Sequence, residues 1–90
     1  MEFVVVVKFS LSKPYDHWVK AFDDHQVARQ GSGIKDIFRH PVIGEQSVVY
    51  AVRTSNPRAV HDMIYGEERA HIEESGFVVG SEIINVCEPI

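Results

Sequence analysis

The sequence EFVVVVKFS at residues 2–10 decides the fold, because it is the strongest strand signal in the chain. Its residues are mostly β-branched or aromatic, and it contains neither glycine nor proline. Side chains alternate between the two faces of a strand, so the odd positions from Phe3 to Phe9 share one face and Val4 and Val6 lie on the other. Both faces are apolar, and we therefore predict a central strand that is covered on both sides.

A second stretch of this kind, SVVYAVRT at residues 47–54, is also apolar on both faces and is predicted to form another central strand. Residues 34–41, IKDIFRHP, have mixed faces and end in Pro41, which is typical of an edge strand. Residues 77–86, FVVGSEIINV, are predicted to form the last strand.

The first of two predicted helical regions begins at Pro14, with the Ser12 hydroxyl available to cap free amide groups. Its apolar side chains recur at the helical spacing i, i+3, i+4, i+7, at Tyr15, Trp18, Val19 and Phe22. A short further turn is expected as far as residue 29. The second region has an apolar stripe at residues 59–64 and a mostly charged continuation at residues 67–75.

The order of elements is therefore strand, helix, strand, strand, helix, strand. Two right-handed crossovers in this order give an α+β, ferredoxin-like βαββαβ fold. Its four-stranded antiparallel sheet has helices on one face and the first and third strands at its centre. These are the two strands that are apolar on both faces.

The opposite face of this sheet would expose valines of the two central strands. A stable monomer rarely exposes such a patch, and a second copy related by a twofold axis is the simplest cover. We therefore predict a homodimer that packs sheet to sheet. The alternative is a monomer whose second face is twisted or partly covered by the tail at residues 87–90.

The composition excludes several classes of protein. The 90 residues suffice for a single domain, residues 1–90, and the net charge of −4 argues against nucleic-acid binding. The longest apolar run has five residues, far below the ~18–20 that span a bilayer, and no export signal is recognised. Cys87 is the only cysteine, so no disulfide framework or cysteine-based zinc site is expected, and the cytoplasm is the expected location.

Four local features carry a resemblance to known proteins: Trp18 in the first helix, Phe22-Asp23, Gly33-Ile34-Lys35 and Phe38-Arg39. With the order of elements, they make the chain similar to the dimeric α/β-barrel superfamily, and more narrowly to a family of small bacterial proteins of unknown function within it. The resemblance implies sheet-to-sheet dimers with a pocket in each protomer between sheet and helices.

That superfamily includes cofactor-independent quinone-forming monooxygenases, haem-degrading monooxygenases, lactone isomerases, polyketide cyclases and members without known activity. The fold therefore does not identify a reaction. Resemblance to the haem-degrading branch would imply an Asn–Trp–His constellation, but the first strand here has no asparagine and the only tryptophan is Trp18. We expect no cofactor.

His71 is the candidate general base. Glu67, Glu68 and Glu74 lie one helical turn away, and a neighbouring carboxylate favours the protonated imidazole. Tyr65 precedes His71 by six positions, a spacing similar to that of the catalytic pair in the plant polyketide cyclase branch. The alternative interpretation is a solvated histidine on a charged face.

Trp18, Phe22 and Tyr50 are the candidate pocket residues, and core packing is the alternative role for each. No metal site is predicted, because His61-Asp62 and His71 do not fall into a His-x3-His or His-Glu-x2-His spacing. His25 shows no partner pattern.

Three functions remain open from the sequence. The first is a small-molecule-binding homodimer that acts as a cofactor-independent enzyme, monooxygenase-, isomerase- or cyclase-like, on a hydrophobic or aromatic substrate. The second is a non-catalytic ligand-binding or regulatory module. The third is a protein-interaction module that uses the acidic C-terminal third, since residues 61–90 hold seven acidic residues against Arg69 alone.

Overall fold

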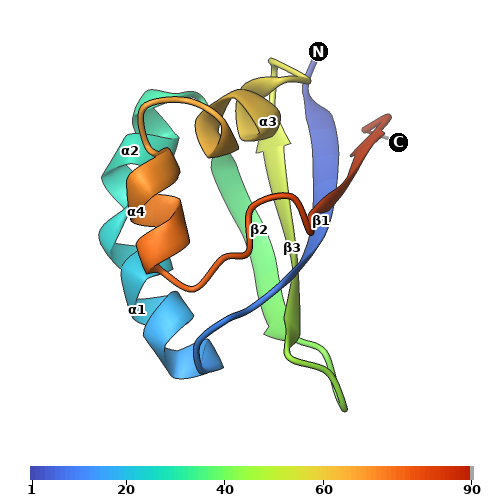
Figure 1. Cartoon of the computed structure of the whole chain (residues 1–90). Coiled ribbons are helices and arrows are strands. Elements are labelled where there is room, and N and C mark those ends of the chain that lie inside the picture. The colour runs from blue at the N-terminus through green and yellow to red at the C-terminus, as the bar shows by residue number, and fades with distance from the viewer. Residues whose placement is uncertain (90) are drawn as a thin grey trace.

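The computed structural model describes residues 1–89, which form one four-stranded sheet and four helices. The strand order is β2-β3-β1-β4, and each strand is antiparallel to its neighbours (Figure 1). This order confirms the ferredoxin-like α+β fold that the sequence predicts. Along the chain the elements are β1 (Phe3–Ser10), α1 (Tyr15–Asp24), α2 (Gln26–Gly31), β2 (Lys35–Pro41), β3 (Ser47–Thr54), α3 (Ala59–Ile64), α4 (Arg69–Glu74) and β4 (Ile83–Cys87).

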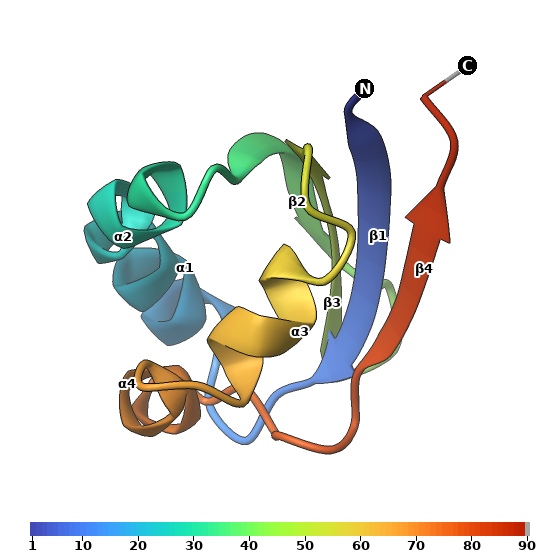
Figure 2. The same cartoon turned by 90° about the horizontal axis from the view of Figure 1, so that it is seen from above.

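The two central strands bury one face completely against the helices. All four helices lie on the same side of the sheet (Figure 2). Val5 of β1 pairs with Val52 of β3, and both are 0% exposed, as are Val7 and Val48. The β-branched residues that favour strands thus also form the floor of the hydrophobic core.

An aromatic cluster fills the space between the central strands and the helices. The Phe9 ring stacks on Phe77 with 4.0 Å between centroids, and lies 5.3 Å from Trp18 and 5.8 Å from Tyr50. Such contacts add about 0.5–1.5 kcal/mol per pair to the stabilisation from burial. The cluster fixes α1 and the segment after α4 on the sheet.

The start of α1 differs from the prediction in one respect. No side chain caps this helix, and its N-cap residue is Pro14. The Ser12 hydroxyl instead donates to the Gly76 carbonyl at 3.3 Å, and the Ser12 amide donates to the same oxygen at 2.8 Å. These bonds tie the segment before α1 to the residues that follow α4.

The last strand is shorter than predicted. The sequence predicts a strand over residues 77–86, but β4 covers only Ile83–Cys87, and Phe77 forms an isolated bridge with Leu11. Gly80 has a φ of +101°, and the Ser81 amide donates to the Val78 carbonyl at 3.0 Å. This turn interrupts the extended conformation because it uses backbone groups that a strand would pair with its neighbour.

A β-bulge interrupts β2. The register shifts between Asp36, which pairs with Val52, and Phe38, which pairs with Ala51. Ile37 is therefore an extra residue on this strand. As a result Asp36 faces the helices, whereas Phe38 and His40 lie on the opposite face of the sheet.

We call this opposite side the open face, and among residues 1–89 no helix or loop covers it (Figure 2). On the central strands it carries Val4, Val6, Val49 and Ala51, of which the three valines are only half-buried, and on β2 it carries Phe38, which is 42% exposed. Of the predicted covering tail, residue 87 is the last residue of β4, and residue 90 lies outside the described residues.

The helices are short. The longest, α1, has 10 residues, about half of the ~20 that a membrane-spanning helix requires. Within residues 1–89, no helix has the length and apolar character to cross a bilayer.

Candidate functional site

A cavity lies between the sheet and the helices. Its volume is about 60 Å³, which is room for a few water molecules. Its lining comes from the four helices, the junction of α1 and α2, β3 and the segment after α4, and most of it is apolar. The polar groups on this lining are His25, Arg29, His71 and Ser75.

The three aromatic residues predicted to form a pocket all line this cavity. Trp18 lies 4.6 Å from Phe22 between ring centroids, and Phe22 lies 5.7 Å from Tyr50. Trp18 is 2% exposed and Tyr50 is 7% exposed, so both also belong to the core. Burial raises the pKa of Tyr50 far above that of a free tyrosine, so its hydroxyl stays protonated.

An ion pair between the buried Arg29, which lines the cavity, and Asp36, whose side chain is 32% exposed, lies at one side of the cavity. The Arg29 guanidinium donates to both carboxylate oxygens of Asp36, at 3.0 Å from Nε and 2.9 Å from Nη2, and a third bond goes to the Phe22 carbonyl. The guanidinium carbon also lies 3.4 Å from the centroid of the Phe22 ring. Arg29 is 6% exposed. The pair joins α2 to β2, and no sequence motif indicates it.

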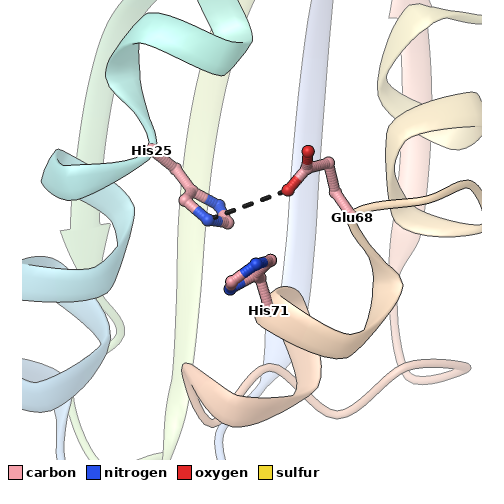
Figure 3. A group of neighbouring side chains, drawn as sticks. All are labelled: His25, Glu68 and His71. Carbon is pink, nitrogen blue, oxygen red and sulfur yellow. Dashed lines mark ion pairs between the residues drawn. The ribbon is translucent and has the colours of Figure 1, made fainter.

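Three polar side chains lie close together in Figure 3, and two of them, His25 and His71, line the solvent-exposed end of the cavity, which we call its mouth. His25 lies at the junction of α1 and α2, Glu68 is the N-cap residue of α4, and His71 lies on α4. The distance from His25 Nε2 to Glu68 Oε2 is 3.8 Å, and the two imidazole centroids are 5.0 Å apart. The structure therefore places the predicted base, His71, on the lining and brings His25 and Glu68 beside it.

Tyr65 is not part of this arrangement. It is 42% exposed, it does not line the cavity, and its hydroxyl donates to Glu82 at 2.5 Å. This hydrogen bond raises the pKa of Tyr65. Tyr65 is the C-cap residue of α3, and its hydroxyl is bonded to Glu82 outside the cavity that His71 lines, so the structure does not bring Tyr65 and His71 together as a pair.

Sequence reasoning did not identify His25 as a site residue. His25 and His71 lie far apart in the chain, and only the packing of α4 against the α1–α2 junction brings them together. The sequence places Glu68 one helical turn before His71, and in the structure this i, i+3 spacing puts both residues on one side of α4.

Solved structures with this fold include enzymes and proteins without an assigned role. A candidate antibiotic biosynthesis monooxygenase from Caulobacter crescentus has a TM-score of 0.69 at 14% identity, over 99% of this chain and 90% of that one. A NIPSNAP family protein of unknown function from Agrobacterium tumefaciens has a TM-score of 0.65 at 12% identity, over 98% and 87%. A monooxygenase of Streptomyces coelicolor, solved with the ligand Nanaomycin D, has a TM-score of 0.57 at 15% identity, over 98% and 87%. Identities this low show a common fold and nothing finer.

The sheet order, the helices on one face and these structural matches show that the chain has the ferredoxin-like fold of these proteins, which is the fold that the resemblance to the dimeric α/β-barrel superfamily implies. The family model described as "Domain of unknown function (DUF3764)" matches residues 1–87, and the chain belongs to this family. No curated protein matches the chain in sequence.

Proposed function

We propose that this protein binds a small hydrophobic or aromatic molecule in the cavity between sheet and helices, and that His71 accepts a proton from it. The observation that carries the proposal is an apolar cavity with imidazoles at its mouth. An apolar lining with a few convergent polar groups is the usual form of a small-molecule site. The ligand in the Streptomyces coelicolor monooxygenase supports the same use of this fold.

The cavity volume limits the ligand. A cavity of about 150 Å³ holds one benzene molecule, whereas this cavity offers about 60 Å³. An aromatic ligand therefore requires the helices to move apart. α4 has no buried residue and packs against the core through the partly buried Ile72, so moving it exposes little apolar surface. Because α4 carries His71, outward movement of α4 takes the base away from the sheet. The return of α4 then places His71 against the bound ligand.

The proposed reaction is proton abstraction from an acidic O–H or C–H of the ligand. A positioned base accelerates such a step by about 10²–10⁴. Monooxygenase-, isomerase- and cyclase-like chemistry on an aromatic substrate all share this step. In the monooxygenase-like case, the electrons of the deprotonated substrate pass to dioxygen, so the chain itself needs no redox group.

We further propose that the protein is a homodimer through the open face. The half-buried valines of the central strands and Phe38 make this side apolar, and they remain partly exposed to solvent. A partner copy would bury about 800 Å² on each side, which is the ordinary size of a stable interface. Each cavity would remain within its own protomer, because the helices lie on the other side of the sheet.

Trp18 provides the binding assay, because it is the single tryptophan and its ring forms part of the cavity wall. We expect 1,4-hydroquinone and larger aromatic compounds to change its fluorescence. Val60→Phe fills the cavity and should abolish the change, whereas Val78→Phe, the same substitution at an exposed position, should preserve it. Equal responses from both variants would place the binding elsewhere.

The oxidation of hydroquinone by air tests the role of His71. Loss of a hydroxyl proton precedes electron transfer to dioxygen, which yields benzoquinone and hydrogen peroxide. With a chelator present to exclude free metal ions, we expect the protein to accelerate benzoquinone formation and His71→Ala to lose this acceleration. The control is His61→Ala, an exposed histidine outside the cavity. If the His71→Ala variant oxidises hydroquinone as fast as the wild type but still binds it, the protein is a binding module and not an enzyme of this kind.

A further inference from the structure

The cluster of His25, Glu68 and His71 has a geometry that the proposed base alone does not require. One ligand atom from each residue, a ring nitrogen of each histidine and a carboxylate oxygen of Glu68, lies within 4.8 Å of the other two. The imidazole planes are inclined by 74°, so the rings do not stack face to face (Figure 3). His25 and Glu68 are half-buried and His71 is exposed, so the cluster lies at the surface end of the cavity.

These donor types are the ligands of a particular class of metal ion. Two imidazoles and one carboxylate hold zinc in catalytic sites that leave a position open, and the same set holds other divalent first-row ions. Two ligand atoms at 2.0–2.1 Å from a tetrahedral zinc lie about 3.3 Å from each other. The distance from His25 Nε2 to Glu68 Oε2 is 3.8 Å, and all three ligand atoms lie within 4.8 Å of one another, so side-chain rotations must bring them closer together to close the set.

Local hydrogen bonds fix the backbone conformation of each of the two segments that carry the three residues. Glu68 and His71 stand one helical turn apart, and the Ile72 amide donates to the Glu68 carbonyl at 3.0 Å. The His25 amide donates to the Ala21 and Phe22 carbonyls, each at 3.2 Å, so the junction of α1 and α2 is a fixed turn. With α4 in the position that the structure shows, side-chain rotation is what brings the three ligand atoms together.

We propose that His25, Glu68 and His71 bind one divalent first-row transition-metal ion, with zinc as the reference ion, at the mouth of the cavity. The absence of a local metal-binding motif does not oppose this site, because its ligands come from two distant segments of the chain. His25 and His71 both line the cavity, so a ligand in the cavity would lie next to the ion.

Metal binding is independent of the proposed function, and the two use His71 in different ways. A nitrogen that binds a metal ion cannot accept a proton from a substrate at the same time. Occupancy by zinc would therefore block His71 as a base and leave the apolar part of the cavity unchanged.

Isothermal titration with zinc chloride tests the site directly. All proteins carry Cys87→Ser, because the exposed cysteine is itself a zinc ligand, and all are stripped with a chelator that is then removed. We expect one ion per chain, and a loss of affinity of about 10-fold or more in each of His25→Ala, His71→Ala and Glu68→Gln. Glu68→Gln is the sharpest variant, since it keeps the side-chain size and lies outside the cavity lining.

Two matched controls complete the experiment. Glu67→Gln makes the same change of charge at the position next to Glu68, and His61→Ala removes an exposed histidine. Neither Glu67 nor His61 belongs to the cluster. We expect both to bind zinc as the Cys87→Ser protein does, and cobalt to give visible absorption bands that the three cluster variants lose. Absence of binding, or equal binding by Glu68→Gln and Glu67→Gln, would overturn the proposal. Val60→Phe, which fills the cavity, should still bind zinc. Zinc binding by the cluster and ligand binding in the cavity can therefore fail independently of each other.

Discussion

Gly76 occupies a position where both the backbone conformation and a neighbouring side chain disfavour any residue that has a Cβ atom. It follows α4 and has a φ of +97°, a left-handed conformation that costs an L-residue about 1–2 kcal/mol. A Cβ atom placed on Gly76 would lie 2.9 Å from Lys13 Cβ and 3.2 Å from the Lys13 amide nitrogen, whereas favourable carbon contacts lie at about 3.5–4.0 Å. Relief of this overlap would stretch the bond from the Ser12 amide to the Gly76 carbonyl, at a cost of about 1 kcal/mol.

We therefore expect Gly76→Ala to lower the free energy of unfolding by about 2 kcal/mol, after the smaller entropy of the unfolded chain offsets part of the loss. For a domain of this size the melting temperature would fall by roughly 8–16 °C. Gly44→Ala is the matched control, since Gly44 has a φ of +80° but no atom lies within 4 Å of the position that its Cβ would occupy. Urea denaturation followed by Trp18 fluorescence, at one protein concentration, measures both. If the two variants lose the same stability, the contact with Lys13 does not restrict this position and the reasoning is refuted.

Three further predictions concern the interface and the charged groups. Light scattering should give twice the 10.2 kDa chain mass. Val6→Arg on the open face should reduce the measured mass to that of one chain, whereas Val78→Arg should leave it unchanged. A monomeric wild type would contradict the interface. Asp36→Asn should cost about 2–3 kcal/mol because it leaves a buried guanidinium without its counter-charge, whereas Asp23→Asn, in a more exposed pair, should cost less than about 1 kcal/mol; equal losses in urea denaturation would count against the difference in burial. Burial raises the pKa of Tyr50 in the folded state, so its contribution to stability is complete below the unfolded pKa of about 10 and falls as the pH rises above it. Tyr50→Phe should therefore lose stability less steeply than the wild type above about pH 10, and parallel pH profiles would show that the Tyr50 hydroxyl does not cause the loss.

The order of the elements and the central strands could be predicted because the signals are local. Residues 47–54 alternate between two apolar faces, and the structure gives β3 these same bounds. The predicted length of the last strand is too great, because residues 77–79 have the apolar, β-branched composition of a strand. Only the positive φ of Gly80 and the bond from Ser81 to Val78 show that the chain turns there.

The candidate site was less accessible to sequence reasoning. Trp18 and Phe22 repeat at helical spacing, so their side of α1 was predictable, and from it their position on the cavity wall. Glu68 and His71 share a face of one helix, and this also follows from the sequence. His25 follows from no local pattern, because its distance from His71 depends on how α4 packs against α1 and α2.

The bulge in β2 determines where this strand tolerates a change in length. Ile37 has no partner of its own on β3, because Asp36 and Phe38 pair with the adjacent residues Val52 and Ala51. Deletion of Ile37 would leave every other side chain of the strand on its present face, whereas deletion at His40 would reverse the residues beyond it. The edge strand is thus open to a one-residue deletion at one position, and homologues that lack this residue would keep both the ion pair of Arg29 with Asp36 and the apolar open face.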